Sequence, residues 1–298
     1  MGKRQSAAAR REAVAGYLFV APSLIHFLVF VAGCVVFSLV LSTMKWDLLT
    51  PPSFIGIRNY TELFHDKILW ISLKNTLLYV LFTIPSGIAL ALALAIALNN
   101  KLRGVALFRT AYFIPVVSSM VAVSIVWRWI FNPDFGLLNW FLGLFGVPAV
   151  DWLGNKSTAL LSVAIVSVWK GLGWNMILFL AGLQSIPTHL YEAAEIDGAN
   201  GWHKFAKITW PLLSPTTFLV VVMAIIDSFQ VFDSVYQMTK GGPELSTTVY
   251  NFYLYNNAFR YFNMGYASAM AWILFVIIAF LTWLQFRFLN KRVQYELG

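Results

Sequence analysis

Long apolar stretches without a charged residue alternate with short charged segments along the 298 residues of this chain. A helix that spans a lipid bilayer needs ~20 consecutive, predominantly apolar residues. The charge-free stretches are 13–44, 75–100, 110–127, 208–226 and 261–286, and Lys170 alone interrupts another at 157–191. The pattern predicts six spanning helices, at roughly 14–43, 71–98, 106–130, 158–184, 215–236 and 264–288.

A further apolar stretch, 135–150, competes for the role of a seventh span. At ~1.5 Å per residue a helix of this length reaches only ~24 Å, whereas the hydrocarbon core of a bilayer is ~30 Å thick. Gly143, Gly146 and Pro148 interrupt it further. We therefore expect an interfacial helix here, with Trp140 and Phe141 at the level of the lipid headgroups.

The composition supports a protein that resides in lipid. Hydrophobic residues make up 59% of the chain and charged residues only 11%, against ~25% charged residues in soluble domains, and the mean hydropathy is +0.71. A net charge of +8 could indicate a protein that binds nucleic acid. The basic residues are scattered between apolar stretches rather than gathered with aromatic residues, so the lipid bilayer is the expected partner and nucleic acid is not.

The basic residues also predict the orientation. With the N-terminus inside, twelve Lys and Arg residues fall on the inner side and seven on the outer side, which favours a multi-pass protein of the cell (inner) membrane with both termini cytoplasmic. The first apolar stretch is too long for a signal peptide, so we interpret it as a retained span. The chain divides into a cytoplasmic N-terminus (1–13), the first span with an outer loop (14–69), five further spans (70–288) and a cytoplasmic tail (289–298).

The residues that carry most enzyme chemistry are sparse or scattered. Cys34 is the only cysteine, and His26, His65, His189 and His203 lie far apart in the sequence, so no metal site is expected. The chain has no phosphate-binding G-x-x-x-x-G-K-[ST] loop, H-E-x-x-H or G-x-S-x-G motif. We expect a protein that is not an enzyme and that depends on another chain for any energy source.

Ionisable side chains inside spans are costly, which makes Lys170 and Asp227 candidates for a functional site. Both lie ~18–20 Å from the inner ends of their predicted spans, at mid-membrane depth. They either form an ion pair that holds two helices together or belong to a polar site for a solute, and the sequence leaves both readings open. Gly171 and Gly173 either loosen this span or allow close helix packing. The residues of a possible substrate path are Trp169, Lys170, Trp174, Asn175, Asp227, Gln230 and Asp233.

The longest polar insert between two apolar stretches is YEAAEIDGANGWHKFAKITWPLLSP, residues 191–215. Its acidic residues come first, in what we expect to be the first turn of a short helix, and its basic residues follow. Gly198 and Gly201 predict a bend, and a second short helix is expected from Trp202 to Trp210, ended by Pro211. Small alanines permit a close approach of another protein, so the segment is interpreted as a docking element.

The string E-A-A-x-x-D-G-A, followed by F-x-x-I-x-x-P-x-x-x-P, resembles the cytoplasmic loop signature of the inner-membrane subunits of binding-protein-dependent ABC importers. It is carried by Glu192, Ala193, Ala194, Asp197, Gly198, Ala199, Phe205, Ile208, Pro211 and Pro215. The stretches 54–60 (FIGIRNY), 109–115, 131–139, 181–187 and 229–243 also resemble this family. The likeness is greatest to the first of two permease subunits in importers of oligosaccharides or glycerol phosphates.

The resemblance implies an all-α integral membrane protein with the type I ABC importer permease fold and a coupling loop at 188–214. It implies a second homologous permease subunit, a dimer of ATPase subunits that binds ATP and Mg, and an extracytoplasmic solute-binding protein, with no cofactor in this chain. The residues expected to couple to the ATPase are Glu192, Ala193, Ala194, Glu195, Asp197, Gly198 and Ala199.

The function implied by the resemblance is import of a carbohydrate by alternating access. Two alternatives remain. One is an importer of the same fold for amino acids or polyamines, against which FIGIRNY and MTKGGP argue by analogy. The other is an intramembrane enzyme acting on lipid or peptide, for which Lys170 and Asp227 would be the only candidate pair.

Overall fold

The structure, a computed structural model, describes residues 7–99 and 104–289. Contacts within the chain group it into two compact units, residues 1–65 with 257–273 and residues 66–256 with 274–298. By length and composition, the described residues include four helices able to cross a membrane, or up to six if each of two bent helix pairs is one span. The prediction of an all-helical membrane protein is confirmed.

The first unit begins with one continuous helix and continues into a small hairpin. Its elements are α1 (Ala7–His26), the π-helical turn η1 (Phe27–Ala32), α2 (Gly33–Ser42), β1 (Met44–Lys45), β2 (Ser53–Phe54) and α3 (Arg58–His65). Strands β1 and β2 pair antiparallel, with Met44 opposite Phe54. The Asn59 side chain donates hydrogen bonds to the Ser42 and Met44 carbonyl oxygens, at 2.8 and 2.9 Å, and so joins α3 to the end of α2.

Helix α15 (Met264–Leu289) begins in this unit, after the π-helical turn η3 (Asn256–Arg260). The Met264 amide donates to the Trp46 carbonyl at 3.0 Å. Beside it, a Cβ atom at Gly265 would collide with the Met44 carbonyl oxygen. Glycine is therefore required for the start of α15 to lie against the hairpin.

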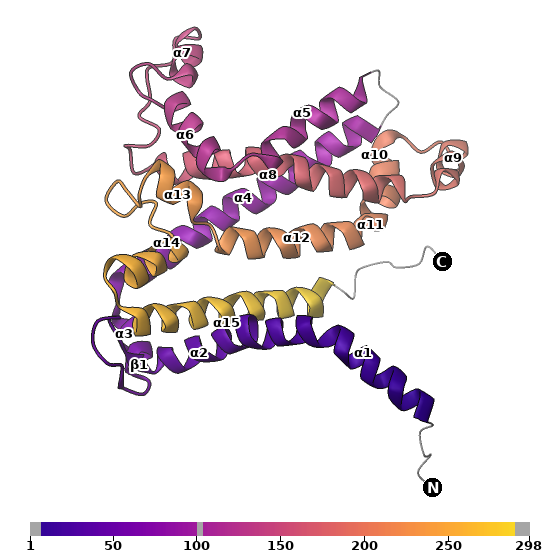
Figure 1. The fold of residues 1–298 in the computed structure, drawn as a ribbon. Helices are drawn as coiled ribbons and strands as arrows, with labels where there is room; N and C mark the ends of the chain where they lie inside the picture. Colours follow the sequence, from indigo (N-terminus) through magenta and orange to yellow (C-terminus); the bar gives the residue numbers. More distant parts are fainter. Residues whose placement is uncertain (1–6, 100–103, 290–298) are drawn as a thin grey trace. The chain divides into compact units, whose positions relative to one another are not determined.

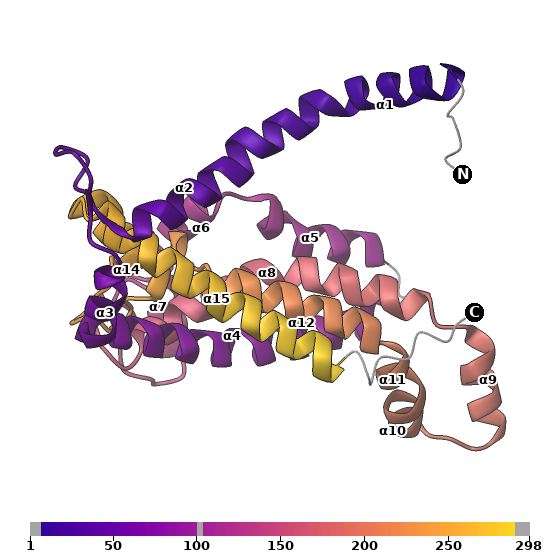
Figure 2. The same cartoon turned by 90° about the horizontal axis from the view of Figure 1, so that it is seen from below.

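The second unit is a bundle of long helices with short helices at their ends (Figure 1). Its long elements are α4 (Lys67–Asn99), α5 (Val105–Val117), α6 (Met120–Ile130), α8 (Ala159–Gln184) and α12 (Ser214–Phe229). Its short elements are α7 (Leu137–Gly143), α9 (Thr188–Ile196), α10 (Gly201–Lys204), the π-helical turn η2 (Phe205–Thr209), α11 (Trp210–Leu212), α13 (Asp233–Met238) and α14 (Tyr250–Tyr255). Figure 2 shows α9, α10 and α11 together beyond one end of α8 and α12.

The predicted third span, 106–130, is not one straight helix, so this detail of the prediction is wrong. Helices α5 and α6 meet at an angle of 102°. Pro115 lacks an amide hydrogen and its ring disturbs the preceding turn. The two residues that follow α5 have an extended backbone, with ψ of 144° at Ser118 and 134° at Ser119.

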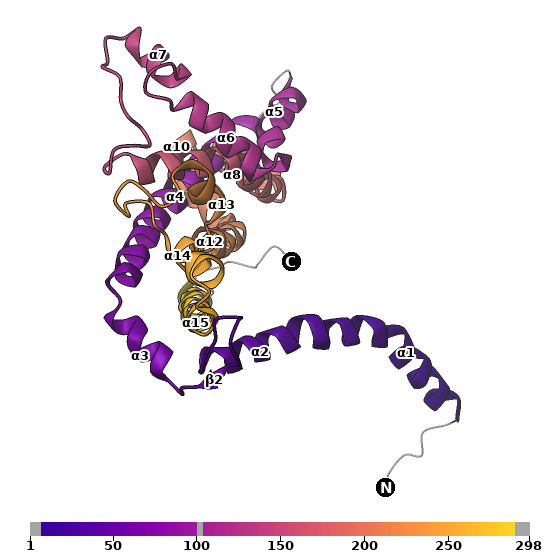
Figure 3. The same cartoon turned by 60° about the vertical axis from the view of Figure 1, so that its left-hand side comes forward.

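The predicted fifth span, 215–236, is also interrupted. Helix α12 ends at Phe229, and α13 starts only at Asp233. The residues in the break, 230–232, are uncharged, so a criterion based on charge alone does not mark it. Residues 135–150 contain only the short helix α7, so the exclusion of a seventh span is confirmed (Figure 3).

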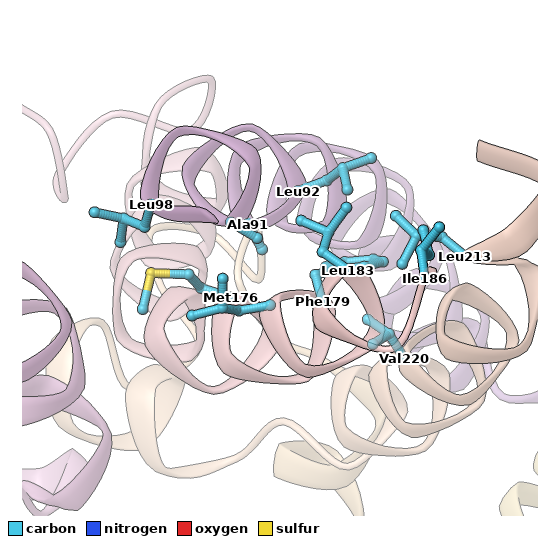
Figure 4. Close-up of a cluster of buried hydrophobic side chains, with 11 residues drawn as sticks. Ala91, Leu92, Leu98, Met176, Phe179, Leu183, Ile186, Leu213 and Val220 are labelled. Atoms are coloured by element: carbon cyan, nitrogen blue, oxygen red, sulfur yellow. The ribbon is translucent and has the colours of Figure 1, made fainter. Parts of the chain in front are cut away.

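The core of the second unit is formed where α4 packs along α8, with α12 beside them (Figure 4). Small side chains, Ala91 and Ala95, are fully buried opposite the large Met176 and Phe179. Because lipid is as apolar as these side chains, close packing rather than removal from water stabilises such a contact in a membrane. This packing sets the spacing of the three helices that carry the polar residues described next.

Candidate functional site

A cavity of about 290 Å³ lies between α4, the α5–α6 break, α8 and α12. Its size is near the lower limit of pockets that hold small molecules, ~300–1,000 Å³. Its polar lining comes from α4 (Tyr79, Thr83), from α8 (Ser167, Lys170, Asn175) and from α12 (Asp227, Ser228). Polar side chains on three spanning helices thus face one space.

Lys170 and Asp227 both line this cavity, but they do not form an ion pair with each other among the described residues. The Lys170 ammonium group donates instead to the Val116 carbonyl oxygen of α5, at 3.2 Å. The direct bridge considered from the sequence is therefore not made in this conformation. The two residues nevertheless line the same cavity.

Gly173 of α8 allows close helix packing, whereas a Cβ atom at Gly171 would meet nothing within 4 Å. Helix α8 is continuous through Gly171 and Gly173. A Cβ atom at Gly173 would collide with the Tyr112 carbonyl oxygen of α5 and lie 3.0 Å from Val116 Cγ2. Gly173 therefore allows α5 to approach α8 closely enough for the contact between Lys170 and Val116.

The structure brings only some of the predicted path residues to the cavity. Trp174 and Asn175 line it together with Lys170 and Asp227, whereas Trp169, Gln230 and Asp233 do not. The Trp169 ring instead makes an edge contact with Trp127, with centroids 5.4 Å apart. Gln230 caps the end of α12, and Asp233 lies in the first turn of α13, beyond the break.

Sequence reasoning missed the contribution of α4. Tyr79, Thr83 and Gly87 line the cavity at a spacing of four residues, which places them on one face of a helix. The Thr83 hydroxyl lies 3.3 Å from the Ser228 hydroxyl of α12. A stripe of polar and small residues along an otherwise apolar span was the signal that would have found this face.

The segment predicted to be a docking element forms two short helices joined by a bend at Gly198. Gly198 has a φ of +75°, in the left-handed region. The Ala199 amide donates to the Ala194 carbonyl at 2.8 Å, and the Gly198 amide donates to the Glu195 carbonyl at 3.0 Å. This pair of bonds is a Schellman motif, which ends a helix with a glycine in the left-handed conformation.

Two details of the predicted element are wrong. Helix α9 starts at Thr188, directly after Pro187, so its first turn contains no acidic residue and Glu192 lies in its second turn. Pro211 does not end the second helix but lies inside α11, whose last residue is Leu212. The helical segment 201–212 and α12, which begins at Ser214, meet at an angle of 64°.

An ion pair spans the bend. The Lys204 ammonium group lies 2.6 Å from the Glu195 carboxylate, and the Glu195 side chain is 64% exposed. The hydrogen bond from Lys204, together with its charge, holds the pKa of Glu195 below the ordinary value of 4.5. The Tyr191 hydroxyl, 2.9 Å from the Thr209 hydroxyl, forms a second connection between α9 and the following helix.

The docking element exposes two large apolar side chains. Ile196 is 87% exposed and Trp202 is 71% exposed, and they lie on either side of the bend. The residues expected to couple, Glu192, Ala193, Glu195, Asp197 and Gly198, are exposed as well, and Ala194 and Ala199 are half-buried. Exposed apolar residues with mixed charges beside them are typical of a surface that binds another protein.

No three His, Cys, Asp or Glu side chains within 7–99 and 104–289 are grouped so that they could hold a metal ion. The polar groups that line the cavity are hydroxyl, amide, carboxylate, ammonium and indole groups.

Comparison with known proteins places these features in a family context. Residues 84–295 match the family model described as "Binding-protein-dependent transport system inner membrane component". A probable ABC transporter permease protein of Bacillus subtilis is 41% identical and covers 98% of this chain and 96% of its own length. The lactose transport system permease protein of Rhizobium radiobacter is 38% identical, and the match covers 94% of this chain and 95% of that protein. The sn-glycerol-3-phosphate transport system permease protein of Agrobacterium fabrum is 37% identical, and the match covers 94% of this chain and 96% of that protein.

Solved structures share the fold. A chain of a bacterial alginate ABC transporter, in complex with an alginate pentasaccharide-bound periplasmic protein, superposes with a TM-score of 0.85 over 96% of both chains, at 22% identity. A second structure of a bacterial ABC transporter that imports alginate has a TM-score of 0.80 at 24% identity.

Proposed function

Since this chain belongs to the family of binding-protein-dependent transport system inner-membrane components, we propose that it is the permease subunit of an ATP-driven importer for a carbohydrate. Two relatives, of 38% and 37% identity over nearly the whole chain, are named for the transport of lactose and of sn-glycerol-3-phosphate. The type I permease fold shared with the alginate transporter is consistent with this proposal.

The observation that carries the proposal is the exposed helix pair between α8 and α12. A permease without a nucleotide site needs a rigid element through which another subunit can move its helices. The pair is rigid because the bend at Gly198 and the bridge from Lys204 to Glu195 fasten it internally. It is attached at both ends to helices that line the cavity, so a push on it acts on α8 and α12.

The importer proposed here has further subunits. A second homologous permease completes the path, two ATPase subunits bind ATP and Mg²⁺, and a solute-binding protein delivers the cargo on the outer side. The helix pair and both termini lie in the cytoplasm, in keeping with the excess of Lys and Arg on that side. ATP-driven closure of the ATPase dimer switches the cavity between inward and outward access.

The cavity is the proposed carbohydrate path. Sugar hydroxyls both donate and accept hydrogen bonds, and the cavity offers a carboxylate at Asp227 and an amide at Asn175. Trp174, which is 44% exposed, provides an apolar surface for the C–H face of a sugar ring. The charged groups in the cavity lining are one carboxylate and one ammonium group, so the lining does not have the cluster of cations that a phosphate site uses.

Cysteine cross-linking tests the assignment of the helix pair. In a Cys34→Ser background, Ile196→Cys is expected to cross-link to the ATPase in the assembled complex, and the yield should change when ATP binds. Leu49→Cys is the matched control, because Leu49 is also 87% exposed but lies between the first two predicted spans. Equal cross-linking at both positions, or none at position 196, would refute the docking assignment.

A further inference from the structure

The break between α5 and α6 leaves carbonyl groups at the end of α5 without a partner in their own helix. The last carbonyls of any helix lack the amide four residues ahead, and lipid offers no water to replace it. Two of them are satisfied locally, because the Ser118 hydroxyl donates to the Ile114 carbonyl at 3.0 Å and the Ser118 amide donates to the Pro115 carbonyl at 3.3 Å. The next carbonyl, that of Val116, accepts its hydrogen bond from a different helix.

The donor to Val116 is Lys170 of α8, at 3.2 Å. A cation is favoured at this position, because the C-terminal end of a helix carries a partial negative charge. Gly173 lies three residues further along α8, on the same face, and brings the backbone of α5 into direct contact at Tyr112. The C-terminal half of α5 is therefore held against α8 at two points, by a charged hydrogen bond at Val116 and by close packing at Tyr112.

We propose that Lys170 is a positioning residue that caps α5 and holds the break of the third span in place, so that Val116 and Met120 form one wall of the cavity. Both of these residues line the cavity, one on each side of the break. The position of the break determines the shape of that wall, and Lys170 is the side chain that connects it to the rigid core formed by α4 and α8. This role goes beyond carbohydrate transport, since it concerns how the path is shaped for any solute.

A distance measurement across the break tests this role. Spin labels at Leu107→Cys on α5 and Val126→Cys on α6, which are 73% and 56% exposed, report the angle between the two helices in a Cys34→Ser background. The complete transporter in lipid nanodiscs is measured by pulsed electron paramagnetic resonance. Lys170→Met removes the donor and the charge but keeps the apolar stem, so we expect a new population at longer distance as the 102° bend opens.

Two controls accompany this variant. Lys170→Arg keeps a charged donor and is expected to restore the original distance distribution. Lys74→Met removes an exposed lysine from α4, away from the cavity, and is expected to leave the distribution unchanged.

A second perturbation covers the case in which Lys170→Met does not fold. In Gly173→Ala the new Cβ pushes α5 away from α8 while Lys170 is intact, so the same long-distance population should appear.

An unchanged distribution in either folded variant overturns the proposal. Loss of uptake in Lys170→Met with an unchanged distribution also overturns it, because Lys170 would then act on the solute directly. If the distances respond as expected but no carbohydrate is imported, the positioning role stands and the proposed cargo is wrong.

Discussion

The bend at Gly198 offers a direct test of how the docking element is built. Gly198 has a φ of +75°, and its amide and that of Ala199 close the end of α9. A Cβ atom added at Gly198 would meet nothing within 4 Å. The substitution Gly198→Ala therefore isolates the cost of the backbone conformation from any effect of crowding.

An L-residue other than glycine in the left-handed conformation costs ~1–2 kcal/mol. Since 1–2 kcal/mol corresponds to a factor of ~5–30 in a two-state population, the closed bend should open ~5–30 times more often in Gly198→Ala. The amide of Ala199 should exchange its hydrogen faster by the same factor, because its bond to the Ala194 carbonyl exists only when the bend is closed.

Hydrogen exchange followed by mass spectrometry, on the complex in nanodiscs, measures this effect in peptides covering residues 190–204. Gly201→Ala is the matched control, since Gly201 also has open space around it, has no positive φ and lies in α10. Alanine there should slow exchange or leave it unchanged. If both variants exchange at the same rate, the left-handed conformation does not govern the bend, and the reasoning fails.

Three further outcomes are expected elsewhere in the chain. Asn139 makes four hydrogen bonds, to the Pro133 and Val150 backbone and to the Trp152 indole, at ~0.5–1.5 kcal/mol each. Asn139→Ala should therefore cost at least roughly 2 kcal/mol of local stability and speed tryptic cleavage at Lys156; unchanged cleavage would contradict this. Because the pKa of Glu195 is lowered on folding, its bridge stabilises the bend above pH 4.5 and is lost as the pH falls through the folded pKa. Carbon-13 NMR of the Glu195 carboxyl should show the pKa return toward 4.5 in Lys204→Met, and an unshifted titration would count against the bridge. A spin label at Phe141→Cys should be more accessible to oxygen than to a water-soluble nickel chelate if α7 lies in the membrane interface, and the reverse would place it in water.

The spans were predictable because lipid imposes one simple requirement, a long stretch without charge. That requirement located α4, α8 and α15 within a few residues. It did not reveal the breaks after Val117 and Phe229, because residues 118–119 and 230–232 are short and uncharged, and an apolar span can contain a few uncharged polar residues. The signal for the first break was Pro115, whose missing amide hydrogen weakens the turn in which it lies.

The candidate cavity was predictable only in part. Lys170 and Asp227 stood out because ionisable residues inside spans are rare. Trp169 is adjacent to Lys170 in sequence, yet successive residues of a helix point ~100° apart, and its ring faces Trp127 instead. Tyr79 lies about ninety residues before Lys170, and nothing in the local sequence of either residue indicates that they share a space.

The sequence by itself determined that this chain resides in a membrane and roughly where it crosses, and it predicted a segment for docking to another protein. These properties depend on local composition and on a continuous motif, so each can be recognised within a short window. Only the tertiary structure decided which polar side chains lie together. It also decided that Lys170 donates a hydrogen bond to the Val116 carbonyl rather than forming an ion pair with Asp227. That choice depends on how closely α5 approaches α8 at Gly173, a distance between residues far apart in the chain that only the packing of the whole bundle determines.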